Sequence, residues 1–125
     1  MKKYLGKYTP ELYAMLRIVT GFMFAMHGSQ KLFGWPGMQE TQELFSLMGI
    51  AGIIEFVGGV LIMIGLFTSI AAFIASGQMA VAYFMVHFPE HWNPLINEGE
   101  KAVFYCFLFL FMAANGSGIW SISKE

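Results

Sequence analysis

Ionisable side chains interrupt the apolar parts of this sequence at a few positions. Such groups are costly inside an apolar segment, and they mark binding sites, proton paths or buried ion pairs. Arg17 precedes His27 by ten residues, roughly 15 Å along a helix at about 1.5 Å per residue. It could form the inner floor of the cluster, or its side chain could reach the cytoplasmic membrane surface. The others would meet at one end of a helical bundle. The sequence therefore predicts a ligand-binding cluster made of Arg17, His27, Lys31, Glu55, His87 and Glu100.

This cluster suits two kinds of ligand. A quinone head group needs hydrogen-bond donors to its carbonyls, which His27, Lys31 and Arg17 could supply within apolar walls. Two His and two Glu could instead bind Zn, Fe or Cu, because imidazole and carboxylate suit these metals. No pair has the Glu-x-x-His spacing of carboxylate di-iron bundles, so a transition metal ranks below a quinone. A small sulfur species stays open as a third ligand, and catalytic residues are not identified.

Each residue of the cluster also has a purely structural explanation. Lys31 and Glu100 lie near predicted helix ends, where water could solvate them, and His87 could cap its helix. His27 could be a packed, hydrogen-bonded histidine. Glu55 lies several residues inside an apolar helix, so we expect it to pair with a basic group inside the bundle.

Long apolar segments must position these groups. Residues 68–88 contain no Asp, Glu, Lys or Arg, and residues 49–67 contain only Glu55. The chain is 57% hydrophobic and 12% charged, with a mean hydropathy of +0.60, whereas soluble domains are about 25% charged. This composition predicts one integral membrane domain over residues 1–125. The net charge of −1 gives no electrostatic basis for binding nucleic acid.

We expect an all-α bundle of four transmembrane helices, over residues 10–32, 49–66, 70–87 and 98–114. Between the first two, residues 38–48 mix apolar and polar side chains, which predicts a short amphipathic helix on the membrane surface. Gln78, in the middle of the third helix, is expected to hold helices together by hydrogen bonding.

The distribution of charge predicts the orientation in the membrane. Lys2, Lys3 and Lys7 precede the first helix, Lys124 lies in the tail, and the long loops carry mostly acids. The positive-inside rule then places both termini in the cytoplasm and the pocket towards the outer leaflet. The first three lysines also resemble the start of a signal peptide, but Arg17 interrupts the apolar stretch that follows, so we expect no cleavage.

Short motifs follow one another along nearly the whole chain. They are Leu16-Arg17, His27-Gly28-x-x-Lys31-Leu32, Gly34-Trp35-Pro36-Gly37, Gly52-Ile53-Ile54-Glu55-x-x-Gly58-Gly59, Gly65-Leu66-x-Thr68, Val86-His87, Gly99-Glu100 and Gly116-x-Gly118. As a set they resemble the DoxX family of small bacterial and archaeal membrane proteins. The resemblance implies a four-helix membrane bundle. The family's usual Ser followed by Asp in the tail is Ser121-Ile122-Ser123-Lys124 here, so no role of that Asp carries over.

The resemblance also implies a link to redox chemistry. The family takes its name from a subunit of a thiosulfate:quinone oxidoreductase, and one relative is reported to join a superoxide dismutase and a sulfurtransferase at the membrane. We therefore expect a redox-associated protein of the bacterial or archaeal inner membrane, with the bilayer and soluble redox enzymes as partners. A homo-oligomer stays open. The alternatives are a small-solute binding or transport protein and a membrane scaffold for soluble redox enzymes.

Overall fold

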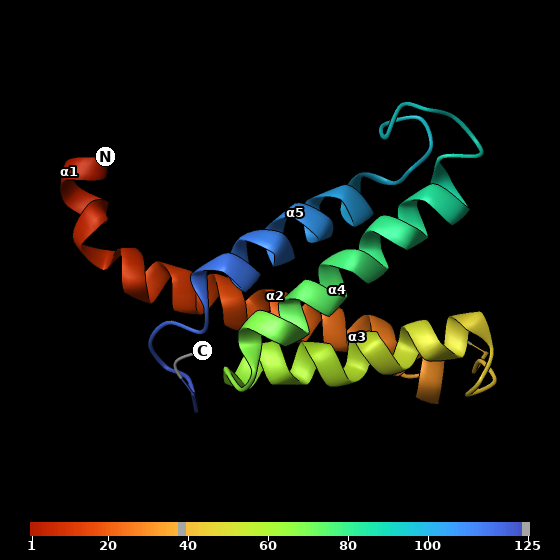
Figure 1. The fold of residues 1–125 in the computed structure, drawn as a ribbon, viewed down its shortest axis with the longest axis horizontal. Helices are drawn as coiled ribbons and strands as arrows, with labels where there is room; N and C mark the ends of the chain where they lie inside the picture. Colours follow the sequence, from red (N-terminus) through yellow and green to blue (C-terminus); the bar gives the residue numbers. More distant parts are fainter. Residues whose placement is uncertain (38–39, 124–125) are drawn as a thin grey trace.

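The computed structural model describes residues 1–37 and 40–123. Its elements are α1 (Lys2–Leu5), η1 (Gly6–Tyr8), α2 (Thr9–Phe33), α3 (Leu47–Ile64), α4 (Thr68–Ala82), the π-helical η2 (Tyr83–His87) and α5 (Glu100–Asn115). Figure 1 shows α2, α3, α4 and α5 as the four long helices. The described residues contain no strand, so the prediction of an all-α protein is confirmed. Lys124, used above for the orientation, lies outside the described residues.

Local sequence explains where the long helices begin and end. Pro10 lies in the first turn of α2, where its missing N–H costs no helical hydrogen bond. Gly34 and Gly65 follow α2 and α3 in the left-handed conformation, with φ of 71° and 73°, which ends each helix at little steric cost. Ser46 caps α3, because its side-chain oxygen accepts a hydrogen bond from the backbone N–H of Gly49 at 3.1 Å.

The connection between α2 and α3 differs from the prediction. Residues 40–46 form coil and turns rather than an amphipathic helix, and Leu47 and Met48 already belong to α3. Positions 38 and 39 lie outside the described residues. The prediction of a helix here was wrong because the backbone bonds elsewhere: Gln42 donates its N–H to the carbonyl of Lys31 at 2.8 Å, across to the end of α2.

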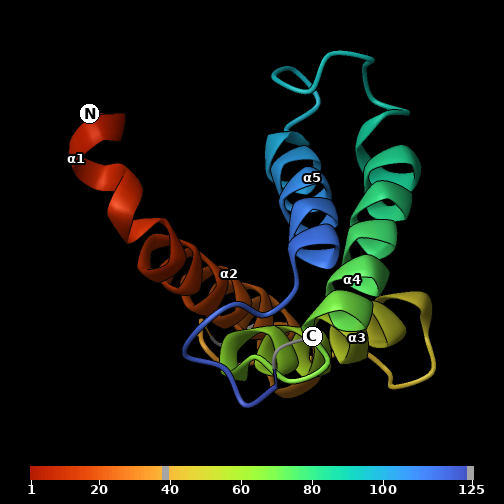
Figure 2. The same cartoon turned by 60° about the vertical axis from the view of Figure 1, so that its left-hand side comes forward.

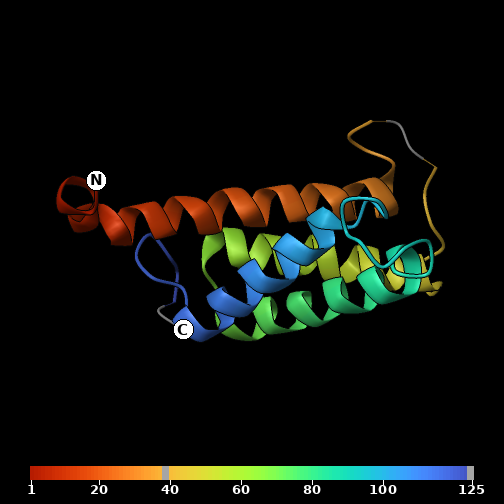
Figure 3. The ribbon, with the colours of Figure 1, turned by 90° about the horizontal axis from the view of Figure 1, so that it is seen from above.

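The four long helices form two antiparallel hairpins. α2 packs along α3, and α4 packs along α5. The two pairs meet at the short turn 65–67 and diverge from there, so that α4 and α5 rise away from the α2–α3 pair (Figures 1 and 2). Residues 34–37 and 40–46 and the loop 88–99 lie at the diverging end, and the N-terminus and residues 117–123 lie towards the other end (Figure 3). The alternating helix directions agree with the predicted up-and-down order.

Glycines allow α2 and α3 to approach closely. A Cβ atom on Gly21 would lie 2.7 Å from the carbonyl oxygen of Gly59, and one on Gly28 would lie 2.6 Å from that of Gly52. Side chains do not fit at such distances. Because the two glycines on each helix are seven residues apart, the helices touch at two points separated by two turns. Small residues serve this role in membranes, where backbone contact drives helix association.

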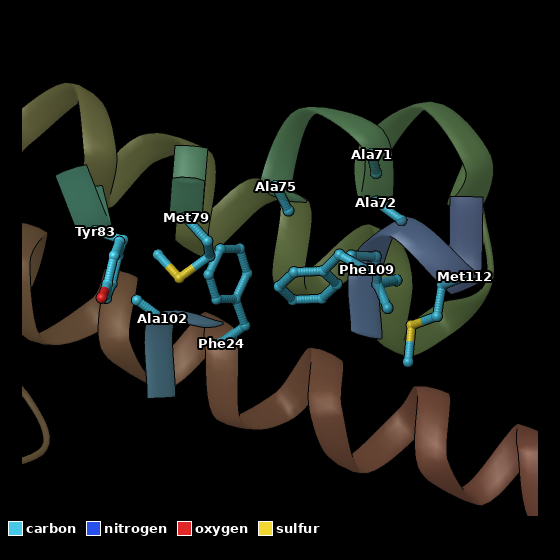
Figure 4. Packing of buried hydrophobic residues seen from close by; sticks show 10 residues of the cluster. Phe24, Ala71, Ala72, Ala75, Met79, Tyr83, Ala102, Phe109 and Met112 are labelled. Atoms are coloured by element: carbon cyan, nitrogen blue, oxygen red, sulfur yellow. The ribbon is translucent and has the colours of Figure 1, made fainter. Parts of the chain in front are cut away.

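A small apolar core joins the two hairpins. Phe24 of α2 contacts Phe109 of α5 with a ring-centroid distance of 4.7 Å, and Ala72 and Ala75 of α4 lie beside this pair (Figure 4). The alanines leave space for the rings, so the hairpins pack tightly here. Met79 belongs to the same core and lies towards the end where the hairpins diverge.

Two helices of the described part are long and apolar enough to cross a membrane. They are Leu47–Ile64, with a mean hydropathy of 2.3, and Thr68–His87, with a mean hydropathy of 1.6. α2 is longer, at 25 residues, but it includes Glu11, Arg17 and Lys31, and α5 has only 16 residues. Length and composition thus identify two of the four predicted spans. Membrane crossing by α2 and α5 stays a prediction.

Candidate functional site

A buried carboxylate holds three helices together at the diverging end. The side chain of Glu55, on α3, is 3% exposed, and its Oε1 lies 2.5 Å from Nζ of Lys31 on α2. Gln78 on α4 donates from Nε2 to the other carboxylate oxygen at 3.1 Å. Both oxygens of Glu55 therefore have a partner. The predictions that Glu55 pairs with a basic group and that Gln78 links helices are confirmed.

A cavity of about 460 Å³ lies beside this trio, between the two hairpins. Its walls are mainly apolar, and most of them come from α3 and α4. The polar side chains that line it are His27, Lys31, Glu55, Gln78, His87, Lys101 and Tyr105. Phe24 and Met79, from the edge of the core, also line the cavity. An apolar chamber with a few converging polar groups is the usual form of a small-molecule site.

A second cavity, of about 520 Å³, lies between α2 and α5. It shares His27, Lys101 and Tyr105 with the first cavity. The rings of His27 and Tyr105 meet edge to face, with centroids 6.2 Å apart. These side chains therefore stand where the two cavities adjoin, and a rotation of either ring would change the space available in both.

The structure brings four of the six predicted site residues together. His27, Lys31, Glu55 and His87 line the first cavity, whereas Arg17 and Glu100 do not. Glu100 is exposed in the first turn of α5, and its neighbour Lys101 lines both cavities instead. Gln78 and Tyr105 complete the site, and the sequence analysis did not include them among the ligand-binding residues. For Gln78 a signal was present, namely a polar side chain in the middle of an uncharged helix.

Arg17 lies at the other end of α2 and is fully buried. Its Nε donates to the carbonyl of Ile62 at 3.1 Å, in the last turn of α3. Its two Nη atoms donate to carbonyls of the C-terminal segment: Ser117 at 2.7 Å, Ile119 at 3.3 Å and Trp120 at 2.6 Å. Arg17 therefore fastens the C-terminal segment onto α3. It neither forms a floor below His27 nor reaches out to the membrane surface, the two roles considered for it.

His87 ends η2 and takes part in a network that fixes the loop 88–99. Its Nδ1 lies 3.1 Å from the carbonyl oxygen of Asn97, and the buried Asn97 side chain donates to Tyr83 Oη at 3.0 Å and to the His91 carbonyl at 2.7 Å. π-Helical turns such as η2 occur frequently at functional sites. This network places the His87 ring at the rim of the first cavity.

The site leaves one polar atom unmatched. Gln78 Oε1 is buried and has no hydrogen-bond partner within the described residues, while the opposite end of the same amide binds Glu55. Buried polar atoms are nearly always paired, so this position has spare hydrogen-bonding capacity. In the described ranges 1–37 and 40–123, no three His, Cys, Asp or Glu side chains gather closely enough to hold a metal ion. The arrangement suits hydrogen bonding to an organic ligand.

Comparison with known proteins assigns this chain to a family. The DoxX family model matches residues 12–88, more than half of the chain. This chain belongs to the DoxX family. The match runs from α2 to the loop after η2. It therefore includes every residue of α2, α3, α4 and η2 that lines the first cavity. It ends before Lys101 and Tyr105 of α5.

Relatives of this DoxX protein occur in several bacteria. It is 40% identical to an uncharacterised protein of Haemophilus influenzae, across 97% of this chain and 95% of the relative. It is 30% identical to the Escherichia coli protein named inner membrane protein YqjF, across 86% of each chain. A Bacillus subtilis protein named "Putative oxidoreductase CatD" is 36% identical across 45% of each chain. No solved structure matches the chain significantly.

Proposed function

We propose that this DoxX protein is a redox-associated component of the bacterial inner membrane that binds a quinone-type head group in the first cavity. The observation that carries the proposal is the position of Glu55. Its carboxylate is buried between Lys31 and Gln78 and beside an apolar cavity of about 460 Å³. Burial of charged groups in such surroundings is costly, and function is the usual reason to retain them.

The cavity offers what a quinone head group requires. Lys31 uses one of its three ammonium N–H groups on Glu55, and His27 and Lys101 also line the space. These donors could bind the two carbonyls of a quinone while Ile54 and Met79 pack against its ring. The relatives named "Inner membrane protein YqjF" and "Putative oxidoreductase CatD" support the location and the link to redox chemistry.

A transport function is the second candidate. It is favoured by the two adjoining cavities, which share His27, Lys101 and Tyr105, and by the buried Glu55. Ionisable groups beside internal cavities also mark proton-coupled pathways. A third candidate is a scaffold that recruits soluble redox enzymes, alone or as a homo-oligomer. This role would need no ligand in the cavity.

Ligand binding separates these candidates. We expect the purified protein in detergent to bind a tail-less quinone analogue. His27→Ala should weaken binding by up to about tenfold and Lys31→Ala by about tenfold or more, because a hydrogen bond is worth roughly 0.5–1.5 kcal/mol net, or roughly 1.5–3 kcal/mol when the donor is charged. Lys3→Ala, on the exposed N-terminal helix, is the matched control and should bind normally. If no quinone binds and proteoliposomes show solute flux that Glu55→Gln abolishes, transport replaces the proposal. If no quinone binds, no solute flux is seen and soluble enzymes co-purify, the scaffold function replaces the proposal.

The orientation has its own test. The lysines before α2 predict that the N-terminus is cytoplasmic and that the loop 88–99 faces outside, which requires α2 to span the membrane together with α3 and α4. A cytoplasmic C-terminus requires α5 to span it as well. Reporter fusions at the N-terminus and within the loop 88–99 should report opposite sides. A loop that reports as cytoplasmic would reverse the orientation and place the cavity at the inner leaflet.

A further inference from the structure

The first cavity opens on one side of the molecule, between α3 and the α4–η2 stretch. The exposed apolar side chains among its lining residues come from these two elements: Leu47, Met48 and Ile50 on α3, and Ile74, Val81, Met85 and Val86 on α4–η2. On α4–η2 the spacings of seven and four residues place the side chains in a stripe along the helix, whereas the three residues on α3 lie within its first turn. The opening is thus bordered by apolar side chains on both sides.

The helices on the two sides of this opening are the same two whose length and hydropathy suit a membrane span. In a bilayer, their exposed apolar side chains would face hydrocarbon rather than water. The polar groups lie deeper, since Glu55 is buried beside the partly buried Gln78 and Lys31. From the rim inwards, the cavity therefore changes from apolar to polar.

We propose that the opening between α3 and α4 admits the ligand sideways from the bilayer, and that the ligand is an amphiphile with a compact polar head and a flexible apolar tail. The head lies against Lys31, Glu55 and Gln78, and the tail lies between the exposed apolar side chains on the two sides of the opening. This proposal rests on the proposed function and specifies its ligand class. It disfavours a small charged solute, which would have to leave water and cross an apolar rim.

The rim also explains why a tail would strengthen binding. Ile50, Ile74 and Val81 are each about half exposed, at 46%, 51% and 54%, although they line a cavity. A tail passing between them would cover apolar surface on both sides, and the gain grows with each methylene that is buried. A ligand without a tail would leave these three side chains about half exposed.

The test uses quinone analogues that share one head group and differ in tail length. We expect the dissociation constant of the longest analogue to be at least tenfold lower than that of the tail-less one. Ile74→Trp narrows the opening and should remove this tail-dependent gain, while tail-less binding stays within about twofold. Phe73→Trp is the matched control, because Phe73 is a similarly exposed neighbour on α4 that does not line the cavity. The tails partition into detergent equally in the measurements on both variants, so this effect cancels when the two variants are compared.

A second pair of variants tests the other side of the opening. Ile50→Trp should act like Ile74→Trp, and Val57→Trp, equally exposed on α3 but outside the cavity, should not. Thermal unfolding of each variant shows whether it folds. Tail-less binding without any gain from a tail, or equal gains in Ile74→Trp and Phe73→Trp, would overturn lateral entry and leave the head-group proposal standing. Binding that depends on the tail but not on the head group would instead overturn the head-group proposal and leave entry through the opening standing.

Discussion

Two buried polar clusters lie along α2, one around Arg17 and one around Glu55, and they differ in how they are closed. Arg17 is fully buried and donates to four backbone carbonyls. Glu55 is also buried, but its partner Lys31 is partly exposed and a cavity adjoins the pair. Burial of charge therefore does not identify a ligand site. The cluster around Glu55 also has a cavity beside it, which a bound ligand would require.

The C-terminal segment accounts for the difference. It covers the closed end, where the backbone N–H of Ile122 donates to the carbonyl of Ile64 at 3.1 Å and Ser117 Oγ donates to Thr68 Oγ1 at 2.7 Å. No segment of the described chain covers the opening between α3 and α4 in the same way. The hairpins diverge there (Figure 2), and residues of both hairpins line the first cavity.

The largest expected effect is at the closed end. Arg17→Met would leave four carbonyls without their donor, and each buried acceptor left unpaired costs roughly 1–3 kcal/mol. Because the segment could detach and find water, we expect a total loss of about 3–5 kcal/mol in the free energy of unfolding. Thermal unfolding in detergent measures it, with exposed Lys7→Met as the control.

Arg17 also tests the contrast between the two clusters. Arg17→Lys keeps the charge but cannot reach all four carbonyls, so its stability should lie between those of the wild type and Arg17→Met. Its dissociation constant for the quinone analogue should stay within twofold of the wild-type value, since Arg17 does not line the cavity. A large loss of binding in a folded Arg17→Lys protein would show that the two clusters act together.

An intermediate effect is expected at Glu55. Glu55→Ala removes the partner of Lys31 and Gln78, and we expect a loss of about 2 kcal/mol, below the ~3–5 kcal/mol typical of fully buried pairs, because Lys31 can turn towards water. Glu43→Ala, on the exposed connection before α3, should change stability by less than about 0.5 kcal/mol. Equal melting temperatures for the two variants would mean that Glu55 contributes no net stability.

Much of this architecture could be predicted from the sequence, for a physical reason. Long, mainly apolar segments and the glycines at helix ends are local signals, and they predict the four long helices and their order. Glu55 stood out because a carboxylate in such a segment requires a partner. The sequence predicted a basic partner inside the bundle without naming one, and the structure shows that this partner is Lys31.

The remaining features depend on contacts that local sequence does not specify. Arg17 was assigned to the ligand cluster, since nothing near it shows that residues 117–120 return to accept its hydrogen bonds. Glu100 and Lys101 are neighbours on α5, and only the rotation of that helix decides which one lines the cavity. The divergence of the hairpins, and with it the position of the cavity, likewise depends on tertiary packing.

The smallest expected effect on stability is at Gly77, on the cavity side of α4. Nothing lies within 4 Å of the position that a Cβ atom would take, and Gly77 lines the first cavity. Gly77→Ala should therefore stabilise the protein by roughly 0.5–1 kcal/mol, because glycine is unfavourable inside a helix.

Gly77→Leu should fold comparably well while its side chain fills part of the cavity, which would weaken binding of a tailed quinone analogue about tenfold. Ala80→Leu adds a similar side chain to α4 outside the cavity lining and should leave the dissociation constant unchanged. Equally tight binding by the wild type and a stable Gly77→Leu protein would show that the ligand lies elsewhere, because an open cavity is only a site if filling it excludes the ligand.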